Sequence, residues 1–467
     1  MKNIFITLLL ISFAVLTASA QCETEPTIER TGAIIHAKKF SVPFKTNPVS
    51  KTTFKATGAQ TEKQANEMFL MIEASVTGAN WGVKNAEAAV LTVFVDGVYN
   101  QDVILFAGAA KFKYRVNLGR FENGEHDFTI VLNEARSAPN AKQVKLSSVL
   151  IFPSELALAK KDGDERDVLA LTHAPVIYAR PDTIDKFSDI PLLTYYEIFP
   201  TGENAFRIRY TVIFSNEDGG TQTAALMARW GRATDIEWIY EIEIKDGEIV
   251  SEIYQGANHE TKTFAGRKIF GAHPLFFNVT VNNNFAASGC SDLRIAPLPI
   301  RADLSSKSRE TLMDENSWTY RIMAEEATRE GRVNAAKLDA NTIADPRDYL
   351  YAEIYSEPKT AWFNIEAQFS DTEKYSSDAG IRQLRVNRPG YVRIALRVPP
   401  HRAAEFPKTI NVSCYADSGK PPANGVCQNI SLIKLIRLDK NYQPVVRKVK
   451  ASPQTVKTGE KASFSSF

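Results

Sequence analysis

The chain has 467 residues, of which 56 are Lys or Arg and 54 are Asp or Glu, so its formal net charge at pH 7 is only +2. This balance argues against a nucleic-acid binder or a general binder of acidic polymers, although a local patch can still matter. The chain is too long for one simple core, so we expect two or three domains.

The first 20 residues have the pattern of a signal peptide. Lys2 precedes the apolar run Ile4–Val15, and Ala18-Ser-Ala20 is a cleavage site of the A-x-A type. We therefore expect a secreted or periplasmic protein that begins at Gln21. No later stretch approaches about 18 uninterrupted apolar residues, so no transmembrane span is predicted.

Cysteine usage fits an oxidising compartment. Cys414 and Cys427 are predicted to form a disulfide that closes a short Pro/Gly loop. Cys22 and Cys290 would then have to join two distant segments. No C-x-x-C motif is present, so a zinc site built on cysteines is not expected.

Residues 21–158 are predicted to form an N-terminal β-sandwich domain. Apolar and polar residues alternate over Leu91–Val95, Asp96-Gly97 is a hairpin signal, and Val98–Phe106 is the return strand. Further strands are predicted at Tyr114–Leu118, Gly124–Leu132 and Val144–Phe152. Short strands at this spacing are typical of a sandwich or jelly roll.

A charged linker, Lys160–Arg166, separates this region from a predicted central β domain at residues 168–300. Its strongest signals are two alternating strands, Phe206–Phe214 and Asp235–Ile244, because successive side chains on a strand face opposite sides. Asp246-Gly247 then turns the chain into a strand at Ile249–Tyr254. The alternation places Trp238 with Tyr240 on the buried face.

The pattern changes after residue 300. Ser305–Asn316 and Met323–Leu338 are rich in charged residues and Ala, so residues 301–345 are predicted to be a polar or helical connection at the surface. A C-terminal β domain is predicted at residues 346–450, and a disordered tail at 451–467. The fold class is therefore mostly β, with two or three sandwich- or jelly-roll-like domains and a short helical or polar connection around 301–341.

The central domain contains the candidate catalytic pair, Asp235 and Glu237. Their carboxylates share one face of a strand, roughly 7 Å apart. Such a pair could ligate a hard cation such as Ca²⁺, or act as an acid/base pair if its environment separates the two pKa values. By alternation Glu241 and Glu243 continue this face. The face could therefore instead be a solvated edge that pairs with arginines across the sheet, Arg207 and Arg209.

Three of the six histidines, His173, His259 and His273, belong to the same region. Neutral imidazoles combined with carboxylates suit Zn²⁺, so these histidines with Asp235 and Glu237 are the candidate metal ligands. Scattered histidines are also explained as surface or hydrogen-bonded residues.

A second group, Arg229, Trp230 and Arg232, is the candidate ligand-binding set. Trp230 could stack on a sugar, and the arginines could hold a uronate or phosphate by bidentate hydrogen bonds. The alternative is a core tryptophan whose neighbouring arginines pair with Glu217 or Asp218. The loop Asn216–Thr221 could bind Ca²⁺, but it is equally explained as a turn.

Two resemblances add expectations. The sequence His173-Ala-Pro-Val-Ile-Tyr-Ala-Arg-Pro-Asp182 resembles the opening strand of proteins related to the vacuolar sorting protein Vps62. Thr234-Asp-Ile-Glu-Trp238 is similar to the Asp-Trp-Glu strand of that group and of the necrosis-inducing NPP1-like proteins. Over residues 173–260 this resemblance implies a β-sandwich in which Asp235 and Glu237 match acidic metal ligands.

The N-terminal region resembles, in a generic way, the accessory jelly-roll domains of secreted carbohydrate-active proteins. The residues concerned are a tryptophan, the Asp96-Gly97 hairpin and a late Gly-x-His strand at Gly124–Leu132. No serine nucleophile elbow, H-E-x-x-H, phosphate-binding loop or dinucleotide fingerprint is present. A β-sandwich glycosidase or polysaccharide lyase has no such compact motif and is not excluded.

The leading hypothesis is a secreted carbohydrate-directed protein that binds or cleaves a polysaccharide at the central β domain, with a Ca²⁺ or Zn²⁺ ion as a possible cofactor. The alternative is a non-enzymatic surface-interaction protein that binds a glycolipid or another protein.

Overall fold

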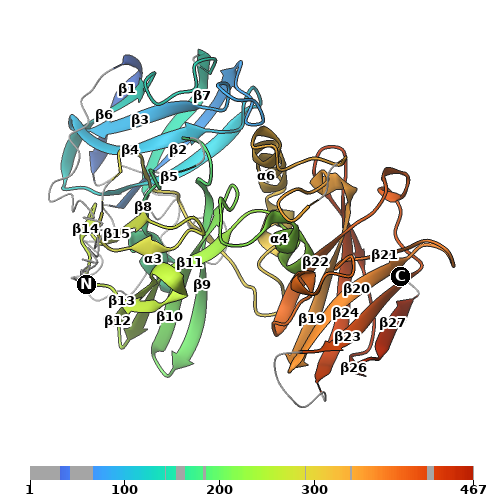
Figure 1. Cartoon of the computed structure of the whole chain (residues 1–467). Helices are drawn as coiled ribbons and strands as arrows, with labels where there is room; N and C mark the ends of the chain where they lie inside the picture. Colours follow the sequence, from blue (N-terminus) through green and yellow to red (C-terminus); the bar gives the residue numbers. More distant parts are fainter. Residues whose placement is uncertain are drawn as a thin grey trace, which may run out of the picture.

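The computed structural model describes residues 32–42, 67–153 except 142, and 164–465 except 182, 184, 185, 290, 337, 338 and 418–424. The predicted signal peptide and the Cys22–Cys290 pair lie outside the described residues. Within them, the strands form three pairs of packed sheets, with helices at the junctions (Figure 1). The prediction of a mostly β fold built from sandwiches is confirmed.

The N-terminal pair of sheets is antiparallel, with strand orders β1-β6-β3-β4 and β5-β2-β7. The strands are β1 (Ala33–Val42), β2 (Glu67–Thr77), β3 (Ala89–Val95), β4 (Val98–Leu105), β5 (Phe112–Arg120), β6 (Gly124–Leu132) and β7 (Gln143–Pro153). The predicted hairpin joins β3 to β4, and both Asp96 and Gly97 have positive φ, as its tight turn requires. Apolar residues such as Leu70, Leu91 and Ile130 fill the space between the sheets.

The central pair has strand orders β13-β12-β11-β10-β9-β18 and β14-β15-β8-β17, with β16 beside β15. Its first elements are α3 (Glu165–Thr172), β8 (Val176–Tyr178), β9 (Pro191–Gly202), β10 (Ala205–Phe214), α4 (Thr223–Trp230), β11 (Ile236–Lys245) and β12 (Glu248–Gln255). The others are η1 (Ala257–His259), β13 (Thr261–Thr263), β14 (Lys268–Ile269), β15 (His273–Asn278), β16 (Phe285–Ala286), β17 (Arg294–Ile295) and β18 (Ile300–Arg301). Aromatic side chains form much of the core, including Tyr210, Tyr240 and Phe276.

A β-bulge in β11 changes which side chains face the core. Tyr210 pairs with Tyr240 but Thr211 pairs with Trp238, so Ile239 is an extra residue in β11. An inserted residue reverses the alternation of side chains beyond it. The prediction that Trp238 shares the buried face with Tyr240 was wrong for this reason. Trp238 is half-buried, with the Arg209 guanidinium carbon 5.3 Å from its ring centre.

The predicted helical connection contains α5 (Thr311–Glu315) and α6 (Trp318–Arg329). We expected it at the surface because its apolar residues are sparse, and this expectation was wrong. Tyr320, Ile322 and Met323 of α6 are fully buried. The helix lies between the N-terminal and C-terminal sandwiches (Figure 1). Ile322 packs in the core of the N-terminal sandwich, and Tyr320 and Met323 pack in the cluster that includes residues of the C-terminal sandwich.

The C-terminal pair of sheets has strand orders β22-β19-β24-β25, with β26 beside β24, and β21-β20-β23-β27. Its strands are β19 (Tyr349–Lys359), β20 (Ala361–Gln368), β21 (Lys374–Ser376), β22 (Gly390–Arg397), β23 (Thr409–Ala416), β24 (Val426–Leu438), β25 (Pro444–Lys448), β26 (Gln454–Lys457) and β27 (Lys461–Ser465). Short 3-10 turns are η2 (Pro346–Asp348), η3 (Arg382–Leu384) and η4 (Pro400–Arg402).

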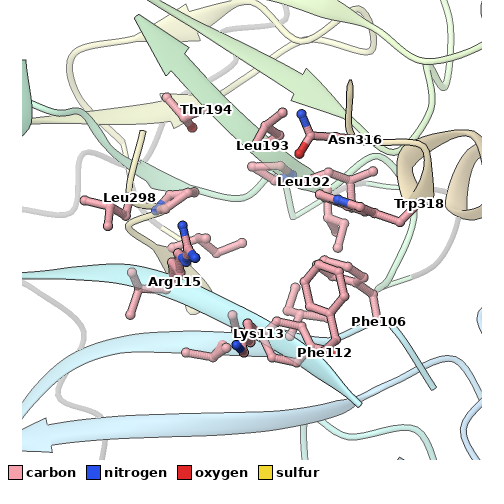
Figure 2. Close-up of a pocket in the computed structure, with 18 of the residues that line it drawn as sticks. Phe106, Phe112, Lys113, Arg115, Leu192, Leu193, Thr194, Leu298, Asn316 and Trp318 are labelled. Carbon is pink, nitrogen blue, oxygen red and sulfur yellow. The ribbon is translucent and has the colours of Figure 1, made fainter. Parts of the chain in front are cut away.

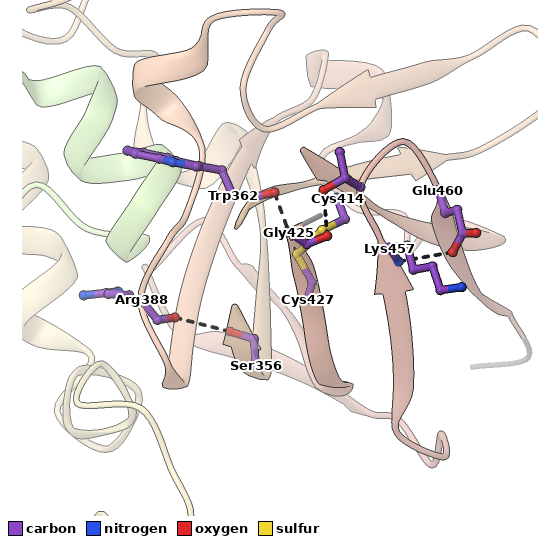
Figure 3. Close-up of a disulfide and its surroundings, with 9 residues drawn as sticks. Ser356, Trp362, Arg388, Cys414, Gly425, Cys427, Lys457 and Glu460 are labelled. Carbon is purple, nitrogen blue, oxygen red and sulfur yellow. Dashed lines mark hydrogen bonds between the residues drawn. A yellow bond between two sulfur atoms is a disulfide. The ribbon is translucent and has the colours of Figure 1, made fainter. Parts of the chain in front are cut away.

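The predicted disulfide between Cys414 and Cys427 is present and joins β23 to β24, which belong to opposite sheets (Figure 3). The tail, in contrast, is not disordered over its described part. β26 and β27 add to the two sheets, and Phe464 is only 3% exposed. Alternating Ala462 and Phe464 reach the core, which the abundance of Ser, Thr and Lys in the tail concealed.

Candidate functional site

Asp235 lies directly before β11 and is buried, with 3% of its surface exposed. The side-chain amide of Asn283 donates to its carboxyl at 3.2 Å and also to Asp189 at 2.7 Å. Burial, together with the negative charges of Glu237 and Glu217, raises the pKa of Asp235 well above its usual value. The environment of Asp235 therefore favours its protonated form.

Glu237, two residues further along the same face, has the opposite tendency. Burial by itself raises its pKa, but hydrogen bonding to His259 and Gln255 outweighs burial and lowers it below the usual value. The His259 Nδ1 atom lies 3.6 Å from the carboxylate, and the Gln255 amide donates to it. The two carboxyl groups on this face of the strand thus have pKa values shifted in opposite directions, upward for Asp235 and downward for Glu237.

A third carboxyl, Glu217, belongs to this cluster and was not predicted as part of it. Burial raises its pKa to about 7, and its carboxylate accepts a hydrogen bond from the Thr221 backbone at 2.8 Å. Asn216 accepts from the backbone N–H of Glu217 at 3.0 Å. These local bonds organise the loop at residues 216–221 as a turn, which is the alternative reading from the sequence.

The same bulge separates Asp235 and Glu237 from the acidic residues that follow. Glu241 lies on the outer face, where Arg207 and Arg209 bind its carboxylate at 3.0 and 2.7 Å. The predicted cross-strand pairing with arginines is therefore present for Glu241. It does not apply to the candidate pair, which faces the opposite side of the sheet.

Of the three candidate histidines, only His259 lies next to the candidate carboxylates. His173 contacts the Leu169 carbonyl at 3.0 Å, and burial lowers its pKa to about 4, so it is neutral. His273 is held between the Glu67 carboxylate and the Ala174 carbonyl. In the described part of the chain, no group of three or more His, Cys, Asp or Glu side chains could hold a metal ion.

Arg232 does not face a surface ligand. It is buried, its Nε atom lies 3.1 Å from Glu310, and its guanidinium also donates to the Thr234 carbonyl. Its ion-pair partners are Glu310 and, at 4.0 Å, Asp235, and not the Glu217 or Asp218 considered from the sequence. Arg232 is a structural cation at the base of α4.

Arg229 and Trp230, at the end of α4, lie against the C-terminal sandwich. The guanidinium carbon of Arg229 is 4.4 Å from the ring centre of Trp230 and 5.9 Å from that of Trp362. The guanidinium carbon of Arg388 lies 4.8 Å from the ring centre of Trp230, and that of Arg382 lies 5.5 Å from the ring centre of Trp362. We call these five residues the Arg–Trp cluster.

The cluster alternates guanidinium and indole groups, an arrangement stabilised by cation–π attraction. Figure 3 shows Trp362 and Arg388 extending from the C-terminal sandwich toward α4. Because arginines already lie over both tryptophan rings, the geometry gives little support to sugar stacking on Trp230. It favours recognition through the guanidinium groups.

Two of the arginines have no carboxylate in direct contact among the described residues, although Glu310 acts on Arg388 from a greater distance. Arg382 pairs with Asp417 at 2.9 Å, but within the described residues no carboxylate lies within 4 Å of Arg229 or Arg388. Arg388 donates to the Arg229 carbonyl at 2.9 Å, and Arg229 reaches the Asn387 amide oxygen at 3.4 Å. Burial and the nearby arginines lower the pKa of Arg388 to about 9 although the negative charge of Glu310 opposes them, so Arg388 stays charged at neutral pH.

The sequence contained no signal for Trp362, Arg382 or Arg388, because they lie more than 130 positions from α4 and belong to no motif. They join the site only because α4 packs against β22.

The chain matches no protein-family model and no curated protein in sequence. The resemblance of residues 173–260 to Vps62-related and NPP1-like proteins therefore remains a prediction. Over the part of the chain that the structure describes, no helix has the length and apolar character needed to cross a membrane.

Proposed function

We propose that the protein binds an acidic carbohydrate at the Arg–Trp cluster. The observation that carries this proposal is the presence of two charged guanidiniums, Arg229 and Arg388, without a carboxylate partner in the described residues. Holding like charges together is unfavourable unless an anion offsets them. A uronate carboxylate or a sugar sulfate would do so through charge-assisted, bidentate hydrogen bonds.

The choice of a glycan over another anion rests on two expectations from the sequence. The chain begins with a predicted export signal, and its N-terminal region resembles accessory domains of carbohydrate-active proteins. The net charge of only +2 makes a local site more plausible than a diffuse attraction to polyanions.

Binding is better supported than cleavage. Asp235 is buried and hydrogen-bonded to Asn283, so a polymer at the surface does not reach it without a rearrangement. A general acid must come within hydrogen-bond reach of the atom that it protonates.

Cleavage is kept as a second candidate because Asp235 and Glu237 have pKa values shifted in opposite directions. That difference is the property expected of the acid and base of a glycosidase or lyase. Depolymerisation assays on polyuronates with wild type, Asp235→Asn and Glu237→Gln test it. Product release that both substitutions abolish would support cleavage, and binding without any product would exclude it.

Calorimetric titration with an oligogalacturonate, with a sulfated glycan, and with a neutral oligosaccharide of the same length tests the binding proposal. We expect an acidic glycan to bind and the neutral one not to. Arg229→Gln and Arg388→Gln should each weaken binding about tenfold, because each removes one charge-assisted contact. The matched control is Arg447→Gln, which removes an exposed guanidinium elsewhere in the C-terminal sandwich.

The proposal fails if neither acidic glycan binds the wild type, or if the Arg229, Arg388 and Arg447 variants bind equally well. If a glycolipid or a protein partner is captured instead with the same dependence on Arg229 and Arg388, the site is right and the ligand class is wrong.

A further inference from the structure

A second site lies at the other end of the central domain, where it meets the N-terminal sandwich. A cavity of about 300 Å³ is lined by β4, β5, the start of β9 and the segment between β17 and β18, which is itself hydrogen-bonded to β5 (Figure 2). Its volume is at the lower end of the range of about 300–1,000 Å³ that small-molecule sites occupy. None of the candidate residues from the sequence lines it.

The walls of the cavity are mainly apolar. Phe106 and Phe112 of the N-terminal sandwich pack on Trp318 of α6, with ring centres 5.2 and 5.1 Å from that of Trp318. Leu193 of β9 and Leu298 of the segment after β17 also line the cavity (Figure 2). An apolar group bound between these walls would move from water to a mostly hydrocarbon environment, and the free energy of this transfer is favourable.

Polar groups interrupt the apolar walls at a few points. Lys113 and Arg115 project from the outer face of β5, and no described carboxylate lies within 4 Å of either of them. Figure 2 shows Arg115 reaching from β5 into the space between the walls. On the β9 side, the Thr194 hydroxyl is buried and has no hydrogen-bond partner among the described residues.

The one acid in the lining, Asp102, does not neutralise these cations. Its carboxylate pairs with Arg136 at 2.6 Å and accepts hydrogen bonds from Thr92 and Tyr99. The charged groups that remain without a carboxylate partner in the lining are therefore the cations Lys113 and Arg115.

We propose that this cavity binds a small amphipathic carboxylate, a molecule with a hydrocarbon body and one anionic end. The body packs between Trp318 and Leu193, and Arg115 is the counter-ion of the carboxylate. The unpartnered hydroxyl of Thr194 supplies a further hydrogen-bonding group. This site is separate from the Arg–Trp cluster and does not depend on the proposed glycan binding.

The probe for this proposal is decanoate, titrated calorimetrically into the full-length protein, with 1-decanol as the neutral counterpart. We expect decanoate to bind at one saturable site and 1-decanol to bind at least about tenfold more weakly, because it lacks the charge-assisted contact. Arg115→Gln should weaken decanoate binding about tenfold. The control Lys145→Gln removes an exposed cation of β7, at the other edge of the same sheet and outside the cavity, and should leave binding unchanged.

Leu298→Trp is the second variant and fills the cavity from a half-buried position. We expect it to abolish decanoate binding while its thermal unfolding stays close to that of the wild type. Absence of decanoate binding to the wild type would overturn the proposal. Equal affinity of wild type and Arg115→Gln would overturn the role of Arg115 and with it the anionic class of ligand. Unchanged binding in a folded Leu298→Trp variant would place the ligand outside the cavity.

Discussion

Gly231 and Arg393 touch so closely that a Cβ atom on Gly231 would lie 2.4 Å from the Cγ atom of Arg393. Gly231 ends α4 in the left-handed conformation, with φ of 65°. Arg393 of β22 is fully buried and bound to Asp314 and Glu353. The last turn of α4, which carries Arg229 and Trp230, is therefore positioned by a contact that has room only for a glycine.

Gly231→Ala is expected to destabilise the protein by about 2 to 4 kcal/mol, because strain at positive φ adds to overpacking against Arg393. Urea unfolding measures this loss. Gly97→Ala is the matched control, since Gly97 also has positive φ but nothing within 4 Å of its added Cβ. We expect the control to cost only about 1 to 2 kcal/mol. Equal costs at the two positions would contradict the tight contact.

Glu217→Gln should change how stability depends on pH. The folded pKa is about 7, above the ordinary 4.5, so between these values the folded state holds more protons than the unfolded state. Wild-type stability therefore falls as pH rises from about 4.5 to about 7. The neutral glutamine has no such slope and keeps an oxygen for the Thr221 backbone.

At pH 8 we expect Glu217→Gln to be more stable than the wild type by up to about 3 kcal/mol, and at pH 4 the two should be similar. Urea unfolding at both pH values gives the comparison. The exposed Glu203→Gln is the control and should show no such difference. A variant less stable than the wild type at pH 8 would count against a raised pKa of Glu217.

His273 links the N-terminal and central sandwiches through a buried contact with Glu67 at 2.6 Å. Burial lowers its pKa, but the Glu67 carboxylate more than compensates, so the net shift is upward. Because the pKa of His273 is higher in the folded state than in the unfolded state, its protonation stabilises the folded protein. This contribution is fully present below the unfolded pKa of about 6.5, and it is lost as pH rises through the folded pKa.

Stability is therefore expected to decline above neutral pH, and His273→Gln should remove that part of the decline. Thermal unfolding between pH 6 and 9 tests this, with His401→Gln as the control at an exposed His–Glu pair. A decline of the same size in the His273 variant would show that another group causes it.

The disulfide between Cys414 and Cys427 closes a loop with a sequence separation of 13 residues. Preventing its formation should cost about 3 kcal/mol, because the unfolded chain gains the freedom that the bond removed. Cys414→Ala with Cys427→Ala, compared with wild type in urea without reductant, measures this cost. Addition of reductant should lower the stability of the wild type but not of the double variant, and an unchanged wild type would contradict the prediction.

Much of the fold could be predicted from residues that are close in the sequence. The alternation over Phe206–Phe214 and the Asp96-Gly97 hairpin correspond to β10 and to the β3–β4 turn. The error at Trp238 has a local cause, because a bulge adds one residue that no alternation pattern reveals. That single residue also separated Glu237 from Glu241, which simple alternation places on one face.

Amino-acid order by itself determined the β character, the positions of strands such as β3, β4, β6 and β10, and the Cys414–Cys427 pair, since each depends on local periodicity or on a short loop. Only tertiary structure decided that α6 is buried and that Arg232 forms an ion pair with Glu310. It also decided that Trp362 and Arg388 contact Arg229. These outcomes depend on which surfaces meet when the sandwiches pack. Contacts between distant segments follow from shape and burial, which local patterns do not encode.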